Sequence, residues 1–284
     1  MNNIELSTVY LPLLDKVYKQ NSKTSILEGD EATMKRGDNG ELKVAKLDMD
    51  ALGDFSRNDG YTKGSTTFRW ETIKYDKERS QDLRIDRLDN AEALRLPFAK
   101  LSSEFIRTKV VPETDAARIA KIAGTEGIST KAETLNGGEA VVSALRACSN
   151  KMDEDEVDAE NRILFITPTL RGEIADLDTT KSKEVLSKFS TIIEVPQTRM
   201  YTKIELKNGK TEYGYAKATD GKEINFLCVE KSAAVVHMEQ FIKYFTPDED
   251  QDGDDNVFKY RNNNLYGHVY ENKLAGVYCS YKAE

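Results

Sequence analysis

The chain is poor in cysteine, histidine, proline and tryptophan. Its 284 residues include only three cysteines, two histidines, six prolines and one tryptophan. Cys148, Cys228 and Cys279 are odd in number, lie far apart and form no C-x-x-C pair. This pattern favours reduced, buried thiols in a cytosolic protein over a disulfide framework or a zinc site. Neither histidine has a cysteine or carboxylate at the spacing of helical metal ligands. We therefore expect no metal centre and no cofactor.

Long hydrophobic runs are also absent. No stretch approaches the roughly 18 apolar residues that a bilayer-spanning helix needs. The first residues, MNNIELSTVYLPLL, contain neither a basic leader nor a small-residue cleavage site. We therefore expect no membrane association and no secretory signal. With 39% hydrophobic and 32% charged residues, the chain is long enough for a substantial core and for two domains.

The sequence lacks the motifs of common enzyme classes. It contains no Walker loop, G-x-G-x-x-G, G-x-S-x-G or H-E-x-x-H pattern. A catalytic pair between a cysteine and His237 or His268 has no flanking motif to support it. The net charge of −8 argues against a dedicated nucleic-acid binder, because neutralising phosphates needs clustered Lys and Arg. These features favour a protein that is not an enzyme.

One acidic segment resembles the start of a calcium-binding loop. Asp248, Asp250, Asp252 and Gly253 match its opening D-x-D-x-D-G pattern, but Lys259 occupies the twelfth position, where a bidentate Glu is required. Helices should also flank such a loop, and strands are expected here instead. The segment is interpreted as a solvated acidic loop between two strands.

The first 80 residues predict an arm and a long hairpin. A helix is expected over residues 5–20, followed by an extended arm over 21–30. A short strand near residues 42–47 and a turn-rich loop over 51–61 precede a strand over 66–75. In that last strand Phe68, Trp70 and Thr72 alternate with Arg69, Glu71 and Ile73. A hairpin this long cannot easily bury both faces within one domain, which favours a partner.

A long helix with a kink is predicted next. Apolar residues at intervals of four, three and four share one helix face, namely Leu94, Phe98, Leu101 and Phe105. Asp89 or Asn90 can cap the start of this helix. Pro97 lies inside the pattern and should kink or divide the helix. Pro112 suits the first turn of a second helix.

The remainder has an α/β pattern. Helices are expected over residues 141–151, 168–174 and 181–189, and buried strands over 162–166 and 224–229. A β-hairpin over residues 200–216 has Asn208-Gly209 as its turn. Strands return over residues 260–264 and 265–278.

The order of these features resembles the major capsid proteins of tailed bacteriophages of Gram-positive hosts, which have the Hong Kong 97-type fold. The matching segments run through almost the whole chain. They are the S-x-T of residues 22–24, Leu52-Gly53-Asp54-Phe55-Ser56-Arg57, Trp70-Glu71-Thr72, Ile85-Asp86-Arg87-Leu88-Asp89, Val110-Val111-Pro112-Glu113-Thr114-Asp115 and residues 260–278. No single motif is diagnostic, but their order over nearly the whole chain is much stronger evidence than any one of them.

The resemblance implies an α+β fold with five parts. Residues 1–27 would form an N-terminal arm, and residues 28–80 an extended β-loop lying across a neighbouring subunit. Residues 81–127 would form the spine helix of a peripheral domain. Residues 128–230 would form a compact axial domain. Residues 231–284 would return to the peripheral domain and end in strands.

The resemblance also implies a function in assembly. The protein would form hexamers and pentamers of an icosahedral head shell that encloses double-stranded DNA, in a virion assembled in the host bacterial cytoplasm. A mildly acidic wall suits this role because it does not grip its contents. No helical scaffolding segment precedes Asn2, so a separate scaffolding protein and a portal are expected partners. The residues expected at contacts between subunits are Asp54, Arg57, Asp59, Tyr61, Arg79, Asp86 and Asp89.

Two alternatives remain open from the sequence. An encapsulin-type compartment shares the fold but packages an enzyme, so its cargo would distinguish it. A hydrolase or binding module built on residues 130–230 would require a deep polar cleft with convergent titratable groups.

Overall fold

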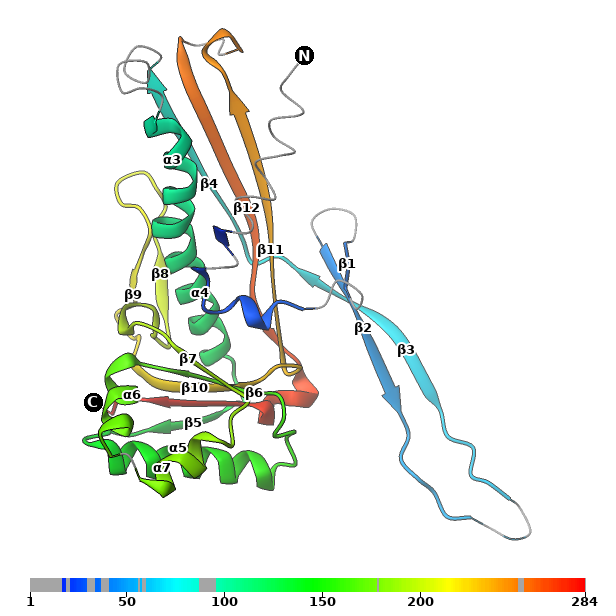
Figure 1. The fold of residues 1–284 in the computed structure, drawn as a ribbon. Helices are drawn as coiled ribbons and strands as arrows, with labels where there is room; N and C mark the ends of the chain where they lie inside the picture. The colour runs from blue at the N-terminus through cyan, green and yellow to red at the C-terminus, as the bar shows by residue number, and fades with distance from the viewer. Residues whose placement is uncertain are drawn as a thin grey trace.

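A computed structural model describes residues 17–18, 21–29, 34–36, 41–55, 57, 60–86, 96–177, 179–249 and 253–283. The molecule has three visible parts (Figure 1). A tall upper part combines a long sheet with a helical spine, a compact α/β part lies below it, and a thin hairpin projects to one side. Among the helices within these ranges, none is both long enough and apolar enough to cross a membrane.

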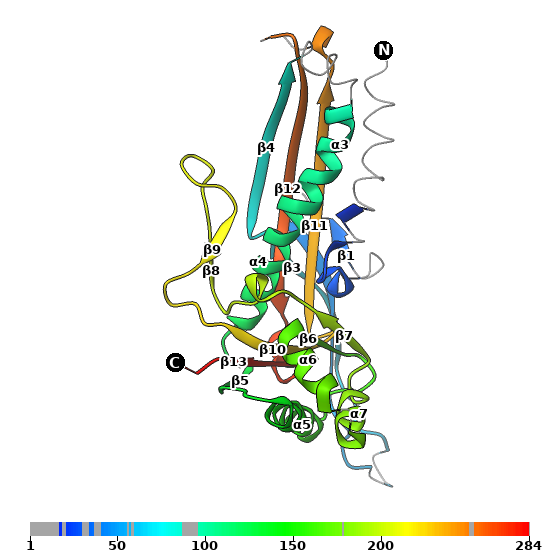
Figure 2. The ribbon, with the colours of Figure 1, turned by 60° about the vertical axis from the view of Figure 1, so that its left-hand side comes forward.

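The lower part contains a five-stranded sheet in the order β5-β13-β10-β6-β7. Its strands are β5 (Ser129–Ala132), β13 (Val277–Tyr281), β10 (Ile224–Glu230), β6 (Arg162–Ile166) and β7 (Thr191–Glu194). Three helices, α5 (Gly138–Glu154), α6 (Pro168–Leu177) and α7 (Thr180–Leu186), lie on one side of this sheet (Figure 2). The C-terminal strand β13 thus lies between β5 and β10, two strands that are distant from it in the sequence.

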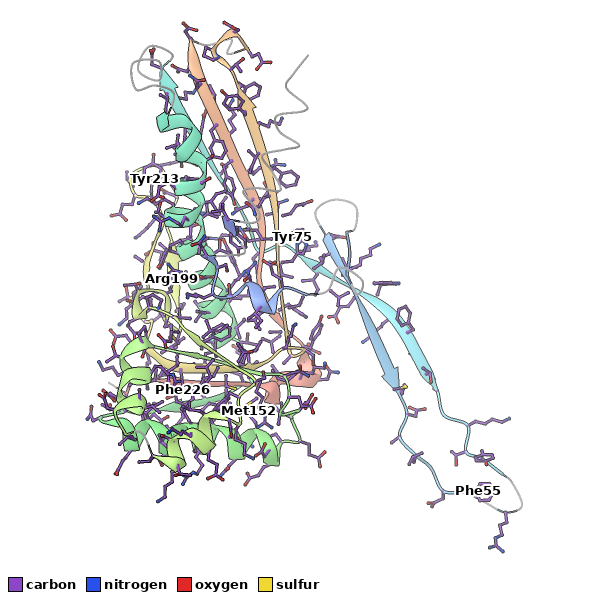
Figure 3. The ribbon with its side chains drawn as sticks, in the orientation of Figure 1. Phe55, Tyr75, Met152, Arg199, Tyr213 and Phe226 are labelled. Atoms are coloured by element: carbon purple, nitrogen blue, oxygen red, sulfur yellow. The ribbon has the colours of Figure 1, made fainter. Side chains whose placement is uncertain are left out.

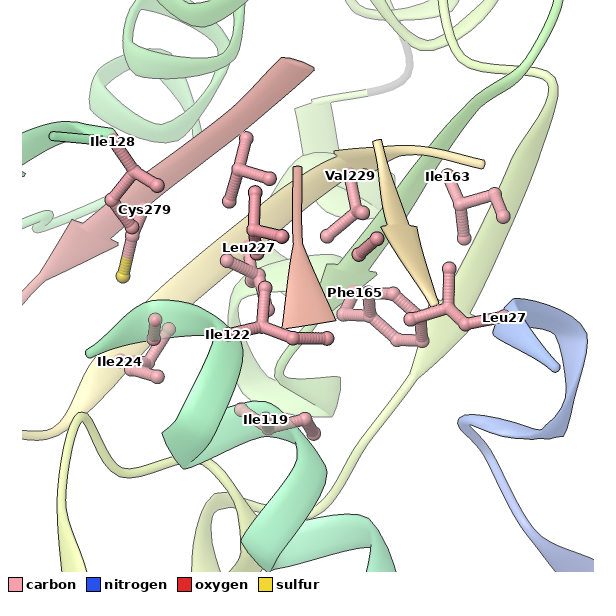
Figure 4. Close-up of a cluster of buried hydrophobic side chains, with 14 of the residues drawn as sticks. Leu27, Ile119, Ile122, Ile128, Ile163, Phe165, Ile224, Leu227, Val229 and Cys279 are labelled. Atoms are coloured by element: carbon pink, nitrogen blue, oxygen red, sulfur yellow. The ribbon is translucent and has the colours of Figure 1, made fainter. Parts of the chain in front are cut away.

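The central strand β6 is buried on both faces. Ile163 and Phe165 face one core cluster, and Leu164 and Ile166 face the other. A strand covered on both sides needs no polar alternation, so the run RILFI is apolar after its first residue. The first cluster includes Ile122 from the helical spine, which joins the upper and lower parts in one core (Figure 4).

The upper part is a three-stranded sheet packed on the helical spine. The sheet has the order β11-β12-β4, with β11 (Ala234–Phe245), β12 (Asp255–Val269) and β4 (Lys77–Asp86). Phe258 and Tyr260 of β12 pack against Ile106 and Val110 of the spine. The acidic segment lies between β11 and β12, where η4 (Pro247–Glu249) precedes residues outside the described ranges.

The spine is continuous from Leu96 to Ala123, which corrects the prediction of two separate helices. It consists of α3 (Leu96–Phe105), the π-helical segment η2 (Ile106–Val110) and α4 (Val111–Ala123), and both junctions keep helical backbone angles. Residues 87–95 lie outside the described ranges, so the kink expected at Pro97 stays a prediction. Pro112, at the start of α4, follows the π-helical turn. A π-helical turn is a rare local change in the hydrogen-bond pattern of a helix.

The projecting hairpin is a small sheet in the order β1-β2-β3. Its strands are β1 (Met34–Arg36), β2 (Glu41–Met49) and β3 (Thr66–Lys74). The pairing of β2 with β3 runs from Glu41 opposite Lys74 to Met49 opposite Thr66. The strand at 42–47 is therefore longer than predicted, and the strand at 66–75 is confirmed.

Several other predictions are confirmed with altered bounds. The helices near 141–151, 168–174 and 181–189 correspond to α5, α6 and α7. The hairpin at 200–216 exists as β8 (Ile204–Leu206) and β9 (Tyr215–Lys217), but its loop is longer than an Asn-Gly turn because Leu206 pairs with Tyr215. Strand β11 was expected only as a strand before the acidic loop, without bounds. The remaining short helices are η1 (Ser25–Leu27), η3 (Gln197–Arg199) and η5 (Glu271–Gly276).

The predictions near the N-terminus are only partly covered by the structure. Of the helix expected over 5–20, only residues 17 and 18 are described, and they are helical. The arm expected to be extended over 21–30 instead contains the 3₁₀ turn η1, and Glu28 then forms a bridge with Val236.

Gly267 allows β12 to cross the spine at close range. A Cβ at this position would lie 2.6 Å from Ile122 Cγ1, closer than packed atoms approach. We expect Gly267→Ala to lower the free energy of unfolding by about 1–3 kcal/mol through overpacking. Gly172→Ala is the matched control, because Gly172 lies within α6 and a Cβ there meets nothing within 4 Å. Gly172→Ala should leave the free energy of unfolding unchanged or raise it by roughly 0.5–1 kcal/mol. Equal changes in the free energy of unfolding for the two variants, measured in urea, would contradict this packing account.

Candidate assembly interface

The root of the hairpin is packed against the long sheet. Leu42, Val44 and Ile73 of the hairpin are buried with Val235 of β11 and Leu265 of β12. This cluster fixes the direction in which the hairpin leaves the body. The predicted alternation in β3 therefore holds at its end, where Ile73 points into the cluster.

Both histidines of the chain also lie at this root. Tyr75 Oη lies 3.1 Å from His237 Nδ1, and His268 Nε2 lies 4.0 Å from a Glu71 carboxylate oxygen. These contacts join β3 and the following bend to β11 and β12. At the root of the hairpin, the histidines thus contact Tyr75 and Glu71, neither of which is a cysteine.

Beyond the root, the hairpin exposes large apolar side chains. Phe68 is 59% exposed, and at the tip Leu52 is fully exposed and Tyr61 is 89% exposed. Phe55, labelled at the far end of the hairpin in Figure 3, is 61% exposed. Large exposed apolar side chains gathered on one projecting element are typical of an interaction site. We define Leu52, Phe55 and Tyr61 as the apolar tip.

The apolar tip has a defined local structure. The rings of Phe55 and Tyr61 form an edge-to-face pair with centroids 5.2 Å apart. Thr62 Oγ1 donates a hydrogen bond of 2.8 Å to the carbonyl oxygen of Asp54. The Ser65 N–H donates to the Asp50 carboxylate at 2.7 Å. These contacts join the two sides of the hairpin next to the apolar tip.

The expected contact residues fall into three groups. Asp54, Arg57 and Tyr61 lie on the exposed tip, and Asp86 is exposed at the end of β4. Asp59 and Asp89 lie outside the described residues. Arg79 is instead engaged inside the chain, so its part in a contact between subunits stays a prediction.

Arg79 connects three segments of one subunit. Its guanidinium donates to both carboxylate oxygens of Glu113 at 2.7 and 3.0 Å, and to the carbonyl oxygen of Lys207 at 2.6 Å. The hydrogen bonds to Glu113 raise the pKa of Arg79 above its ordinary value. Because Arg79 belongs to β4, Glu113 to α4 and Lys207 to the loop after β8, the pair holds the β8–β9 hairpin against the upper part. A bidentate arginine contact fixes geometry as well as charge.

Asp115 anchors the N-terminal arm to the spine. Its side chain is fully buried. It accepts hydrogen bonds from Ser22 Oγ at 2.7 Å, Lys23 N–H at 3.0 Å, Thr24 N–H at 3.2 Å, Thr24 Oγ1 at 2.7 Å and Arg199 at 3.1 Å. Such dense donation satisfies a buried carboxylate that would otherwise be costly. We define this set of contacts as the arm anchor.

A second buried charge extends the arm anchor. Arg118, on the next turn of α4, is fully buried, and donates to Glu28 at 3.2 Å and to Thr24 Oγ1 at 3.3 Å. The guanidinium also lies over the ring of Tyr18, 5.8 Å from its centroid. Burial raises the pKa of Tyr18, so the phenol stays neutral beside this cation. Residues 18–28 are thus held on one face of α4.

The sequence motifs identified the segments that form the arm anchor and the Arg79 contact, but not which residues in them contact each other. The S-x-T of residues 22–24 and the P-E-x-D of residues 112–115 are far apart in the sequence. In the structure they are joined by hydrogen bonds to Asp115. Arg79, in the charged strand, meets the glutamate of the same P-E-x-D. Two sequence signals could have suggested these contacts: the alternating charges of the strand, and an aspartate at helical spacing from Val111 and Ile119.

The cysteines lie in the two core clusters of the lower part. Cys148 and Cys228 belong to one cluster and Cys279 to the other. Burial raises the pKa of Cys279 to about 12, so its thiol remains protonated at neutral pH. No group of three His, Cys, Asp or Glu side chains that could hold a metal ion occurs among the residues described.

Reversing the charge at the tip should impair association without unfolding the subunit. Arg57 lies in the exposed turn, and Arg57→Glu would place like charges together at a contact with a neighbour. The thermal midpoint of the isolated subunit should hardly change, while the yield of assembled particles should fall. Arg57→Lys, which keeps the charge, is the control. Unfolding of the isolated subunit with intact assembly would show that the tip packs on its own chain.

Comparison with solved structures identifies the fold. The capsid of the cyanophage P-SCSP1u aligns over 88% of this chain and 85% of that chain, with a TM-score of 0.57 and 14% sequence identity. A virus-like particle from Pyrococcus furiosus aligns over 99% of both chains, with a TM-score of 0.59 and 13% identity. The mature capsid of bacteriophage PhiM1 aligns over 86% and 82%, with a TM-score of 0.55 and 9% identity.

No family model matches the sequence, and no curated protein matches it. The similarity to these solved structures therefore lies in the fold of the backbone and not in the sequence. The chain has the Hong Kong 97-type fold of phage capsid proteins, as the α+β prediction stated.

Proposed function

We propose that the protein is the major capsid protein of a tailed bacteriophage. Many copies would associate into hexamers and pentamers that close as an icosahedral shell around double-stranded DNA. Residues 1–27 serve as the arm, residues 28–80 as the loop reaching a neighbour, residues 81–127 as the spine, residues 128–230 as the domain at the symmetry axes, and residues 231–284 as the returning strands. The protein acts through assembly rather than catalysis.

The observation that carries this proposal is the exposed hairpin on a capsid fold. Its root is packed, yet its outer half leaves Phe68, Leu52, Phe55 and Tyr61 in solvent. A single subunit gains no stability from apolar side chains at a tip that covers no core. A neighbouring subunit supplies the missing surface, and repeated weak contacts gain strength through valency.

Further partners follow from the same proposal. A separate scaffolding protein directs assembly, and a portal admits DNA, in the cytoplasm of a bacterial host. The net charge of −8 suits a wall that does not bind its contents tightly.

A shell that packages a protein is the second candidate. The observation in its favour is the alignment with the Pyrococcus furiosus virus-like particle over 99% of both chains. The fold serves either purpose, so the contents of the particle decide between them.

Analysis of particle contents tests the proposal. Particles isolated from the native source would be treated with nuclease, opened and extracted. We expect double-stranded DNA protected from the nuclease, in particles that also contain a portal. Particles that contain an enzyme and no nucleic acid would favour the second candidate and overturn the first.

A further inference from the structure

We propose that Asn136 is a site of spontaneous chemical modification, at which the side-chain amide is converted to a carboxylate. Asn136 lies in the connection between β5 and α5 of the lower part, and Gly137 follows it in the chain. The inference concerns the folded chain itself and does not depend on the proposed function.

The reaction needs only the chain and water. The backbone nitrogen of Gly137 attacks the side-chain carbonyl carbon of Asn136, and a bond forms between these two atoms. The bond from that carbon to the side-chain nitrogen breaks, and the side-chain nitrogen leaves as ammonia with the proton of the Gly137 N–H. Water then opens the five-membered imide at either of its two carbonyls, which gives aspartate or isoaspartate. No electrons are transferred, so no oxidant or reductant takes part.

The sequence contains three Asn-Gly pairs, in which this attack is least hindered because glycine carries no Cβ. Asn39-Gly40 lies outside the described residues. Asn136 and Asn208 are both exposed, so the access of water does not distinguish them. The hydrogen bonds around each pair do.

At the Asn208 pair, both reacting groups are already hydrogen-bonded. The Gly209 N–H donates to the carbonyl oxygen of Glu212 at 2.9 Å, and Asn208 Oδ1 accepts from the Lys210 N–H at 2.9 Å. The nitrogen of Gly209 reaches the side-chain carbon only after both bonds have opened. Opening two hydrogen bonds before each attack slows the reaction by roughly tenfold or more.

The Asn136 pair is not restrained in this way by the part of the chain that the structure describes. Neither the Asn136 side chain nor the Gly137 N–H has a hydrogen-bond partner among those residues. Residues 133–136 belong to no helix or strand, and a Cβ at Gly137 would meet nothing within 4 Å. The nitrogen of Gly137 therefore reaches the side-chain carbon of Asn136 without the opening of either bond that protects Asn208.

The product places a negative charge at the start of α5. Gly137 is the N-terminal cap residue of α5 and offers no side-chain acceptor to the first N–H groups of the helix. A carboxylate at position 136 lies next to the positive end of the helix dipole, where an anion is favourable. We expect Asn136→Asp, which represents the aspartate product, to have a thermal midpoint equal to or above that of wild type. Asn136→Gln is the uncharged control, and an aspartate variant that melts below it would contradict this effect on α5.

Peptide mapping of the folded full chain tests the site. Purified protein would be kept at neutral pH for several weeks and digested at mildly acidic pH with endoproteinase Glu-C, which cleaves after glutamate. The two pairs are then released on separate peptides, residues 134–139 and 206–212. We expect conversion at Asn136 to be at least about tenfold faster than at Asn208, with both aspartate and isoaspartate as products. A sample digested at time zero measures conversion during the digestion itself.

The denatured chain is the matched control. In guanidinium chloride the hydrogen bonds around Asn208 are lost, so the two pairs should convert at similar rates. Equal rates at the two pairs in the folded chain would overturn the inference, and so would conversion of Asn136 only after unfolding. Both outcomes are independent of assembly and leave the shell proposal unchanged.

Discussion

Replacing Asp115 with alanine is expected to destabilise the protein by about 3–5 kcal/mol, the usual cost of breaking a buried charge pair by removing one partner. The variant leaves the donors of Ser22, Thr24 and Arg199 without their acceptor in a buried site. The arm should detach from α4 before the rest of the chain unfolds. Urea unfolding measures the global effect, and trypsin cleavage after the exposed Lys23 measures release of the arm.

Asp220→Ala is the matched control for this prediction. Asp220 forms an ion pair with Lys203, but both side chains are more than 60% exposed. Exposed pairs contribute about 0–1 kcal/mol, so stability and cleavage after Lys23 should stay near wild type. If Asp115→Ala behaves like Asp220→Ala, the arm anchor does not hold the arm.

Removing both aromatic rings from the tip should abolish assembly at ordinary concentrations. In the double variant Phe55→Ser, Tyr61→Ser, each contact loses two large apolar groups, and burial of each contributes about 1.5–3 kcal/mol. Since 1.4 kcal/mol corresponds to a tenfold change, the threshold concentration for assembly should rise at least about a hundredfold. Light scattering across a concentration series measures this threshold.

The stability of the isolated subunit separates association from folding in that experiment. Exposed substitutions usually change stability by about 0.5 kcal/mol or less, so the thermal midpoint should not move. The exchange Phe55→Tyr, Tyr61→Phe keeps two rings and should assemble almost normally. Normal assembly of the serine variant would show that the tip is not an interface.

Local pattern predicted much of the lower part and the hairpin strands. The run of Ile163 to Ile166 identified β6, and the alternation around Phe68 and Trp70 identified β3. These signals depend on short-range periodicity and burial, which the sequence carries directly. One feature of the spine was predicted wrongly. Pro112 was placed in the first turn of a second helix, whereas η2 continues into α4 without a break. The kink expected at Pro97 stays a prediction, because residues 87–95 lie outside the described ranges.

The contacts between distant segments could not be derived from local pattern. Strand β11 is paired with β12 across a long hairpin, and its central residues are half-buried rather than sharply alternating. Ser22 and Asp115 are 93 residues apart. Their contact depends on the packing of the whole upper part.

Electron microscopy of the purified full-length chain at high concentration, with and without a scaffolding protein, tests the central claim most directly. The account predicts closed, isometric shells, or ring-shaped capsomers that convert to shells. A monodisperse monomer under every condition would contradict it.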